Sequence, residues 1–182
     1  LRVAAALVLT APFTPMLFMG EEWGASTPWQ YFADHGDERL AEQVRAGRRS
    51  EFAGFGWRPE NVPDPQDPAT VARSTLDWSE PAREPHHGLL AWHRELIALR
   101  RSVPELASGR LEAVEVTCSA EDRWLAVGRG RVAVVANLAA HPQQVPVHGP
   151  AARILLASED GCAPGDRQVQ LPAESVAIVR VR

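Results

Sequence analysis

The chain has 182 residues, of which 45% are hydrophobic and 23% charged, and its formal net charge at pH 7 is −4. This length and apolar content allow a buried core and argue against intrinsic disorder, and the acidic balance argues against a dedicated nucleic-acid binder, which needs a basic face. The two cysteines, Cys118 and Cys162, exclude a disulfide scaffold; we expect two separate buried thiols, and a single bridge between them stays open.

The first twenty residues are apolar but divide into short pieces. Residues 1–9 predict the end of a helix, and a first residue that is Leu instead of Met indicates a fragment of a longer protein. Pro12 and Pro15 argue against a membrane helix, because each removes a backbone donor, and no cleavage signature supports a secretory signal. Met16–Met19 predicts a short buried strand, which completes the αβ step of an α/β fold. We expect no membrane contact and a cytoplasmic location.

The acidic pair Glu21–Glu22 follows the predicted strand and precedes a loop-rich stretch that continues to Pro85. Within this stretch, residues 37–46 have helical composition and predict one short helix. A loop of this length is uncommon in a compact domain unless it is functional, and binding groups of (β/α)8 barrels gather on loops after the strands. The pair is therefore a candidate site, with two solvated carboxylates at a turn as the equally weighted alternative.

Aromatic and polar side chains cluster in and around the same loop: Trp23, Trp29, Tyr31, Phe32, Asp34 and His35. A sugar site needs this combination, because pyranose faces pack on rings and sugar hydroxyls bind carboxylates and imidazoles. The alternative is that the rings only pack the loop, which we favour for Tyr31 and Phe32; for Trp57 both interpretations stay open. No HExxH, GxSxG, P-loop or dinucleotide motif occurs, so the sequence predicts neither a metal nor a cofactor.

Residues 84–101 predict a helix with one apolar face and a basic end. The apolar positions recur at three- to four-residue spacing: Leu89, Trp92, Leu96 and Leu99. Trp92 is therefore expected in the core, and Pro104 prevents the helix from continuing.

From residue 109 onward the hydrophobic period becomes two, which is typical of strands. Six short strands are predicted between turns, at residues 111–118, 124–127, 131–138, 144–147, 153–157 and 174–181. This pattern predicts a small antiparallel β-sandwich. Asn137, in an apolar strand, is expected to be a strand-end or turn residue and not a site residue. The chain is therefore divided into residues 1–107 and residues 108–182.

The run TPMLFMGEEWGASTPWQYFADH at residues 14–35 resembles the last barrel strand and following loop of α-amylase-type glycoside hydrolases, most closely the maltooligosyltrehalose trehalohydrolase branch. GRRSEFAGFGW, STLDWSEP and HGLLAWHRELIALRR extend the resemblance through residue 101, and the closing ESVAIVRV is similar to the last strand of the β domain. The resemblance implies an α/β plus β fold. Residues 1–107 would be the C-terminal end of the (β/α)8 catalytic barrel (last strand, long loop, last helix), and residues 108–182 a C-terminal β-sandwich domain.

The resemblance also implies a function: a glycosidase of trehalose biosynthesis that cleaves the α-1,4 glucosidic bond next to the trehalose end of maltooligosyl-trehalose and releases trehalose. Such enzymes use a retaining two-carboxylate mechanism. The motifs that carry those carboxylates are absent here, so no catalytic residue is assigned and this fragment alone is predicted to be inactive. What is implied instead is a substrate-contacting loop formed by Glu21, Glu22, Trp23, Trp29, Asp34 and His35. The expected partners are maltooligosyl-trehalose or a related α-glucan and the N-terminal part of the same protein, with no nucleic acid.

Two other functions stay open. One is a different α-glucan enzyme of the same superfamily, a branching or debranching relative, which the sequence upstream of Leu1 would identify. The other is a noncatalytic carbohydrate-binding module in the sandwich. Five of the six tryptophans precede the sandwich, which contains only Trp124, and this placement disfavours the module.

Overall fold

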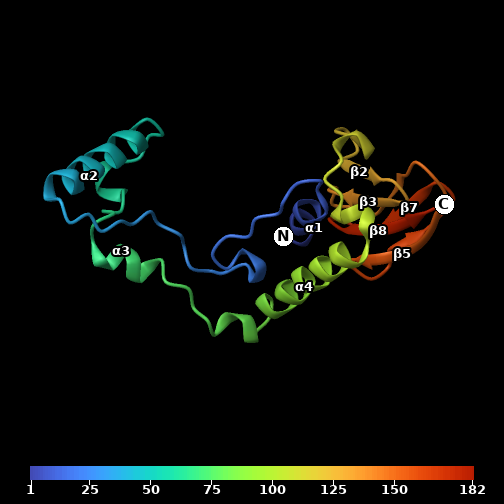
Figure 1. Cartoon of the computed structure of the whole chain (residues 1–182), viewed down its shortest axis with the longest axis horizontal. Coiled ribbons are helices and arrows are strands. Elements are labelled where there is room, and N and C mark those ends of the chain that lie inside the picture. Colours follow the sequence, from blue (N-terminus) through green and yellow to red (C-terminus); the bar gives the residue numbers. More distant parts are fainter. The chain divides into compact units, whose positions relative to one another are not determined.

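The computed structural model describes residues 1–182, which form two compact units. One unit combines residues 1–24 with residues 80–182, and the other contains residues 25–79. The first unit contains the β-sheets together with three α-helices, whereas the second contains most of the loop-rich stretch and two α-helices of its own (Figure 1).

Two antiparallel sheets form the predicted sandwich. The larger sheet has the strand order β1–β2–β3–β8–β5, and the smaller has the order β4–β7–β6. Their bounds are β1 (Val114–Ser119), β2 (Trp124–Arg129), β3 (Val132–Asn137), β4 (Gln143–Pro146), β5 (Ala151–Ala157), β6 (Ala163–Pro164), β7 (Gln168–Leu171) and β8 (Val176–Val181). Side chains from the facing sides interdigitate in one core, where Val135, Val145 and Val169 are fully buried.

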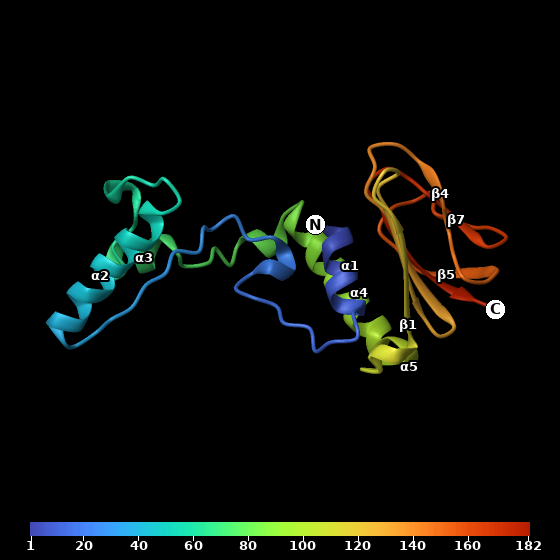
Figure 2. The ribbon, with the colours of Figure 1, turned by 90° about the horizontal axis from the view of Figure 1, so that it is seen from above.

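Three helices cover the other face of the larger sheet (Figure 2). They are α1 (Arg2–Thr10), α4 (His86–Ser102) and α5 (Pro104–Ala107). Leu9, Leu96 and Leu106 of these helices share a core with Val134 of β3 and Ile178 of β8. The central strands are therefore buried on both faces, which explains why β3 and β8 are apolar at nearly every position. The helix predicted at residues 84–101 is confirmed, and Trp92 is 4% exposed, as expected for a core residue.

Two arginines hold the end of α1 in place, one from the sheet and one from α4. Arg129 of β2 is 2% exposed, and its guanidinium donates to the carbonyl oxygen of Thr10 and to two carbonyl oxygens in and just after α5. Arg100 of α4 donates to three carbonyl oxygens of residues 9–13, at 2.7 to 2.9 Å. The last carbonyls of a helix have no partner inside the helix, and the helix dipole favours a cation there. Both arginines therefore stabilise the end of α1.

The loop after α1 differs from the sequence prediction. Residues 11–20 contain no regular secondary structure, so the strand predicted at Met16–Met19 is not formed. A strand is held by ladder hydrogen bonds to its neighbours, and both sheets of this structure are antiparallel and exclude these residues. Met16 is consequently 79% exposed. The loop leads into η1 (Glu21–Trp23), one of three 3₁₀ turns in this unit, with η3 (Glu80–Ala82) and η4 (Leu111–Ala113).

Residues 25–79 are organised around α2 (Glu38–Ala53) and α3 (Pro68–Arg73), with η2 (Pro59–Asn61) between them. Asp37 and Asp67 cap the N-terminal ends of the two helices: the Asp37 side chain accepts hydrogen bonds from two backbone N–H groups of the first turn, and the Asp67 side chain accepts one. The predicted short helix is confirmed at its start but continues to Ala53. It passes through Gly47, which costs about 1 kcal/mol in a helix relative to Ala. No helix of either unit is both long enough and apolar enough to span a membrane.

Asn137 is structural, as expected: its amide donates to the carbonyl oxygens of His141 and Pro172 at 2.8 and 2.7 Å, and its Oδ1 accepts from a backbone N–H at 2.9 Å. The cysteines are free thiols, but only Cys162 is partly buried. Cys118 is exposed, contrary to the prediction, because it lies on an edge strand whose outer face is open to solvent.

Candidate functional site

The acidic pair lies on η1, between two glycines with left-handed backbone. Gly20 has φ 82° and Gly24 has φ 65°, conformations that glycine adopts without steric cost, so the GEEWG run favours this tight turn. Glu21 is exposed, and its Oε2 accepts a hydrogen bond from the N–H of Phe18 at 3.3 Å. Glu22 is partly exposed and makes no hydrogen bond or ion pair within residues 1–182. The Glu22 carboxylate can therefore accept hydrogen bonds from a ligand.

The buried side chain of Trp23 holds this turn in place. Its side chain is 3% exposed, and its indole N–H donates to Oε2 of the buried Glu80 at 3.2 Å. Its carbonyl oxygen lies 2.9 Å from Nδ1 of His86 at the start of α4. A buried indole that satisfies its one donor contributes packing energy. Within residues 1–182, Trp23 therefore braces η1 against η3 and the start of α4.

Trp29 lines an aromatic pocket within residues 25–79. The pocket has a volume of about 400 Å³, and its rings are those of Trp29, Tyr31, Phe52 and Trp57. The guanidinium carbon of Arg48 lies 4.9 Å from the centroid of Tyr31 and 4.8 Å from that of Phe52, so cation–π attraction holds these two rings in place. Trp29 and Trp57 are 52% and 50% exposed. Half-exposed rings around a fixed cation provide apolar surfaces on which the face of a sugar can pack.

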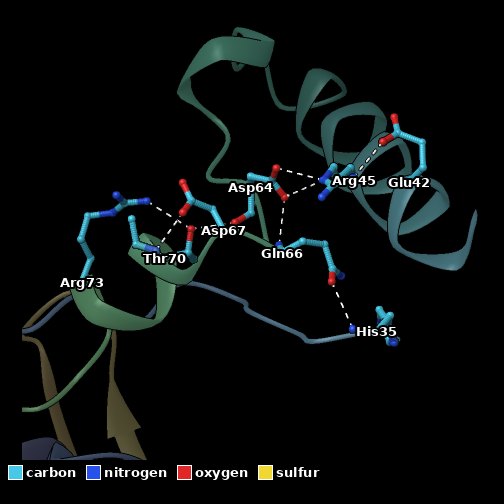
Figure 3. Close-up of polar contacts among 9 residues, drawn as sticks. His35, Glu42, Arg45, Asp64, Gln66, Asp67, Thr70 and Arg73 are labelled. Atoms are coloured by element: carbon cyan, nitrogen blue, oxygen red, sulfur yellow. Dashed lines mark hydrogen bonds and ion pairs between the residues drawn. The ribbon is translucent and has the colours of Figure 1, made fainter. Parts of the chain in front are cut away.

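Asp34 lines a second hollow in the same unit, together with Gln66. Oε1 of Gln66 accepts the N–H of His35 at 3.2 Å, and the backbone N–H of Gln66 donates to Asp64, which is itself held by Arg45 (Figure 3). Nε2 of Gln66 is buried and has no hydrogen-bond partner. A buried donor without a partner costs about 1–3 kcal/mol, and a ligand hydroxyl that accepted this hydrogen bond would offset the cost.

One ion-pair network holds the backbone beside the second hollow. Arg45 pairs with Glu42 at 3.0 Å and with Asp64 at 2.9 Å. The hydrogen bond to Glu42, and the nearby Asp64 carboxylate, raise the pKa of Arg45 above its ordinary value. Arg45 therefore stays cationic and positions Asp64, which in turn positions the backbone of Gln66. Within residues 1–182, no three His, Cys, Asp or Glu side chains are grouped so that they could hold a metal ion.

The six predicted site residues thus fall into three groups: Glu21, Glu22 and Trp23 on η1, Trp29 in the aromatic pocket, and Asp34 and His35 beside Gln66. Sequence reasoning missed Arg48 and Gln66. Arg48 carries a usable signal, since it lies four residues before Phe52 on one helix face. The sequence carries no such signal for Gln66, because its role depends on a buried Nε2 atom without a hydrogen-bond partner, which only the fold reveals. These groups offer aromatic rings together with hydrogen-bond acceptors and donors, which are means of binding a carbohydrate.

Comparison with known proteins gives matches along the whole chain. A family profile described as a domain of unknown function, DUF3459, matches residues 109–178. The malto-oligosyltrehalose trehalohydrolase of Arthrobacter ramosus is 56% identical over 149 residues, which are 82% of this chain and 25% of that protein. The protein of the same name from Rhizobium sp. strain M-11 is 47% identical over 180 residues, 99% of this chain and 30% of that protein. The chain therefore spans less than a third of the length of these relatives.

Solved structures extend the comparison to the fold. A crystal structure of a protein described as a candidate alpha amylase, from Salmonella typhimurium, is 34% identical to this chain and has a TM-score of 0.77. The match covers 100% of this chain and 30% of the other. A trehalulose synthase structure is 19% identical with a TM-score of 0.65, a likeness that concerns the fold alone. These matches confirm the predicted fold class, the C-terminal end of a (β/α)8 barrel followed by a small antiparallel β-sandwich.

Proposed function

Since the chain belongs to the α-amylase-type glycoside hydrolase family, as a C-terminal part similar to malto-oligosyltrehalose trehalohydrolases, we propose that the protein carrying it releases trehalose from maltooligosyl-trehalose. It would do so by cleaving the α-1,4 glucosidic bond next to the trehalose end. The observation that carries this proposal is the 47% identity to a protein of that name over 99% of the chain. Retaining cleavage needs two carboxyl groups about 5 Å apart across the bond, and we assign both to the protein outside residues 1–182.

Within that enzyme, residues 1–107 are proposed to complete the catalytic barrel and residues 108–182 to form the domain that follows it. Residues of the loop that begins at Glu21 would then contact the substrate. Glu22 and Asp34 would accept hydrogen bonds from sugar hydroxyls, Gln66 would donate one from Nε2, and Trp29 would pack against a sugar face. Two features support these roles: Glu22 has no partner in the chain, and Gln66 has a buried donor without one. The cytoplasmic location belongs to the same proposal.

The roles of the two carboxylates can be separated in the complete protein by exchanging each for its amide. Glu22→Gln is expected to lower kcat/KM for maltotriosyl-trehalose, because a hydrogen bond to a charged group contributes roughly 1.5–3 kcal/mol, equivalent to about 10- to 150-fold. Maltopentaose, which lacks the α-1,1-linked terminus, should lose less. Glu21→Gln is the matched control, since Glu21 is exposed and already accepts the N–H of Phe18.

The alternative role for Glu22 is to brace its own loop. In that case Glu22→Gln would reduce kcat/KM for both substrates equally and would lower the melting temperature as well. A loss confined to maltotriosyl-trehalose, with an unchanged melting temperature, supports recognition of the trehalose end.

A further inference from the structure

A groove lies on the sandwich, where the two sheets do not fully overlap. β1 is an edge strand of the larger sheet, and β4 is an edge strand of the smaller one. β4 packs over β2 and β3, so the inward face of β1 is left beside the open edge of the sandwich. Glu115 and Thr117 project from this inward face and are exposed. Polar residues on the inner side of a sandwich strand indicate contact with water or a ligand at that place.

Small residues on β2 and β3 leave unfilled space at the floor of the groove. In the antiparallel register, Glu115 lies opposite Gly128, and Gly128 lies opposite Ala133. Directly opposite residues share one face of a sheet, so neither of these two floor positions carries more than a methyl group. A Cβ at Gly128 would lie 3.1 Å from Nδ1 of His148 and 3.4 Å from Cβ of Glu115, which shows that these two side chains close over this glycine. The resulting hollow has a volume of about 260 Å³.

The walls of the groove combine one large ring with hydrogen-bonding groups. Trp124, partly buried, supplies an indole face, and Glu115, Thr117 and His148 supply a carboxylate, a hydroxyl and an imidazole. Nε2 of His148 lies 3.0 Å from the carbonyl oxygen of Gly130, an acceptor, so Nε2 carries the proton. In the tautomer with the proton on Nε2, Nδ1 is an acceptor, and it faces the space above Gly128. Sugar hydroxyls can donate to this nitrogen and to the Glu115 carboxylate.

We propose that this groove is a second carbohydrate site, which holds a glucose unit of an α-glucan chain without taking part in bond cleavage. Trp124 packs against the apolar face of the sugar, while Glu115 and His148 accept hydrogen bonds from its hydroxyls. The choice of an α-glucan rests on the proposed function, which supplies the substrate class. The sandwich contains only one tryptophan, and it lines this groove.

The test uses the complete protein in native electrophoresis through gels with and without amylopectin. Trp124→Ala is expected to weaken amylopectin retention about tenfold, since an aromatic contact contributes up to about 1.5 kcal/mol beyond area burial. Trp124→Phe, which keeps a ring, should recover part of the retention. Glu115→Gln, at an exposed position, should weaken retention without affecting the fold. Val116→Ala is the control, because Val116 is 59% exposed on the opposite face of the same strand.

The kcat/KM for maltotriosyl-trehalose should stay unchanged in all four variants. Unchanged retention of Trp124→Ala and Glu115→Gln would overturn the proposal. Retention that falls only together with kcat/KM and melting temperature would also overturn it, because the groove would then be a contact with the rest of the protein. If the wild-type protein releases no trehalose but these variants still lose amylopectin retention, the proposed function fails and the groove remains a glucan site.

Discussion

Arg129 offers a sharp test of how the helices are held to the sandwich. Replacing it with Met keeps a long apolar side chain but removes all three hydrogen bonds that the guanidinium donates to carbonyl oxygens. Burial, together with the positive charge of Arg100, lowers the pKa of Arg129 from its ordinary value. An arginine nevertheless stays protonated at ordinary pH. The effect of the substitution should therefore be the same between about pH 6 and 9.

The magnitude follows from two opposing contributions. Hydrogen bonds to a charged group contribute roughly 1.5–3 kcal/mol each, and each acceptor left buried without a partner costs about 1–3 kcal/mol. Removing a buried charge relieves a desolvation penalty of several kcal/mol. We expect Arg129→Met to lower the free energy of unfolding by about 3 kcal/mol. For a chain of this length that corresponds to a fall in melting temperature of roughly 6–12 °C.

Thermal unfolding of the 182-residue chain, followed by circular dichroism, measures this fall. Arg131→Met is the matched control, because Arg131 is exposed and lies only two residues away; its effect should stay within about 0.5 kcal/mol. Equal melting temperatures for Arg129→Met and the wild type would refute the reasoning. A loss that grows steeply with pH would also refute it, since the guanidinium does not titrate in that range.

Three further predictions concern single side chains. Asn137→Ala should destabilise the chain by about 1–3 kcal/mol, because it removes the hydrogen bonds to the carbonyl oxygens of His141 and Pro172 and leaves the buried N–H of Ala139 without its acceptor; urea unfolding measures the change. Gln66→Glu keeps an acceptor for the N–H of His35 but removes the unpaired Nε2 donor. It should raise KM of the complete protein for maltotriosyl-trehalose about 5- to 150-fold if Nε2 binds sugar, and leave KM unchanged if it does not. Iodoacetamide at about pH 8 should label Cys118 before Cys162. Cys118 is exposed, whereas burial raises the pKa of Cys162 and so disfavours its reactive thiolate. Peptide mass spectrometry identifies the labelled thiol, and equal labelling rates would contradict this order.

Much of the fold was predictable because the spacing of hydrophobic residues along the chain indicates which side chains are buried. The helix at residues 84–101 and the strand around residues 174–181 bury a regular set of side chains, and both predictions are confirmed. β7 was missed, although the alternation in Gln168–Leu171 indicates a strand, because the glycines and prolines around it resemble one long turn. The predicted strand at Met16–Met19 depends on parallel neighbours outside these residues, and no local pattern can supply them.

The candidate site was predictable in composition but not in geometry. The aromatic and acidic residues of the loop indicate carbohydrate chemistry, yet the sequence could not distinguish the buried ring of Trp23 from the half-exposed ring of Trp29. That difference arises from packing under α4, which is a long-range contact. The unpaired Nε2 of Gln66 and the groove beside Trp124 likewise depend on which atoms the fold brings together.

The most direct test of the proposed function is product analysis of maltotriosyl-trehalose incubated with the complete protein, using chromatography that separates trehalose from maltose and glucose. Hydrolysis next to the trehalose end predicts trehalose and maltotriose as the two initial products, in equal amounts. Initial release of glucose or maltose without trehalose, or transfer of the malto-chain to another glucan, would contradict the proposal and would favour a different α-glucan enzyme of the same family.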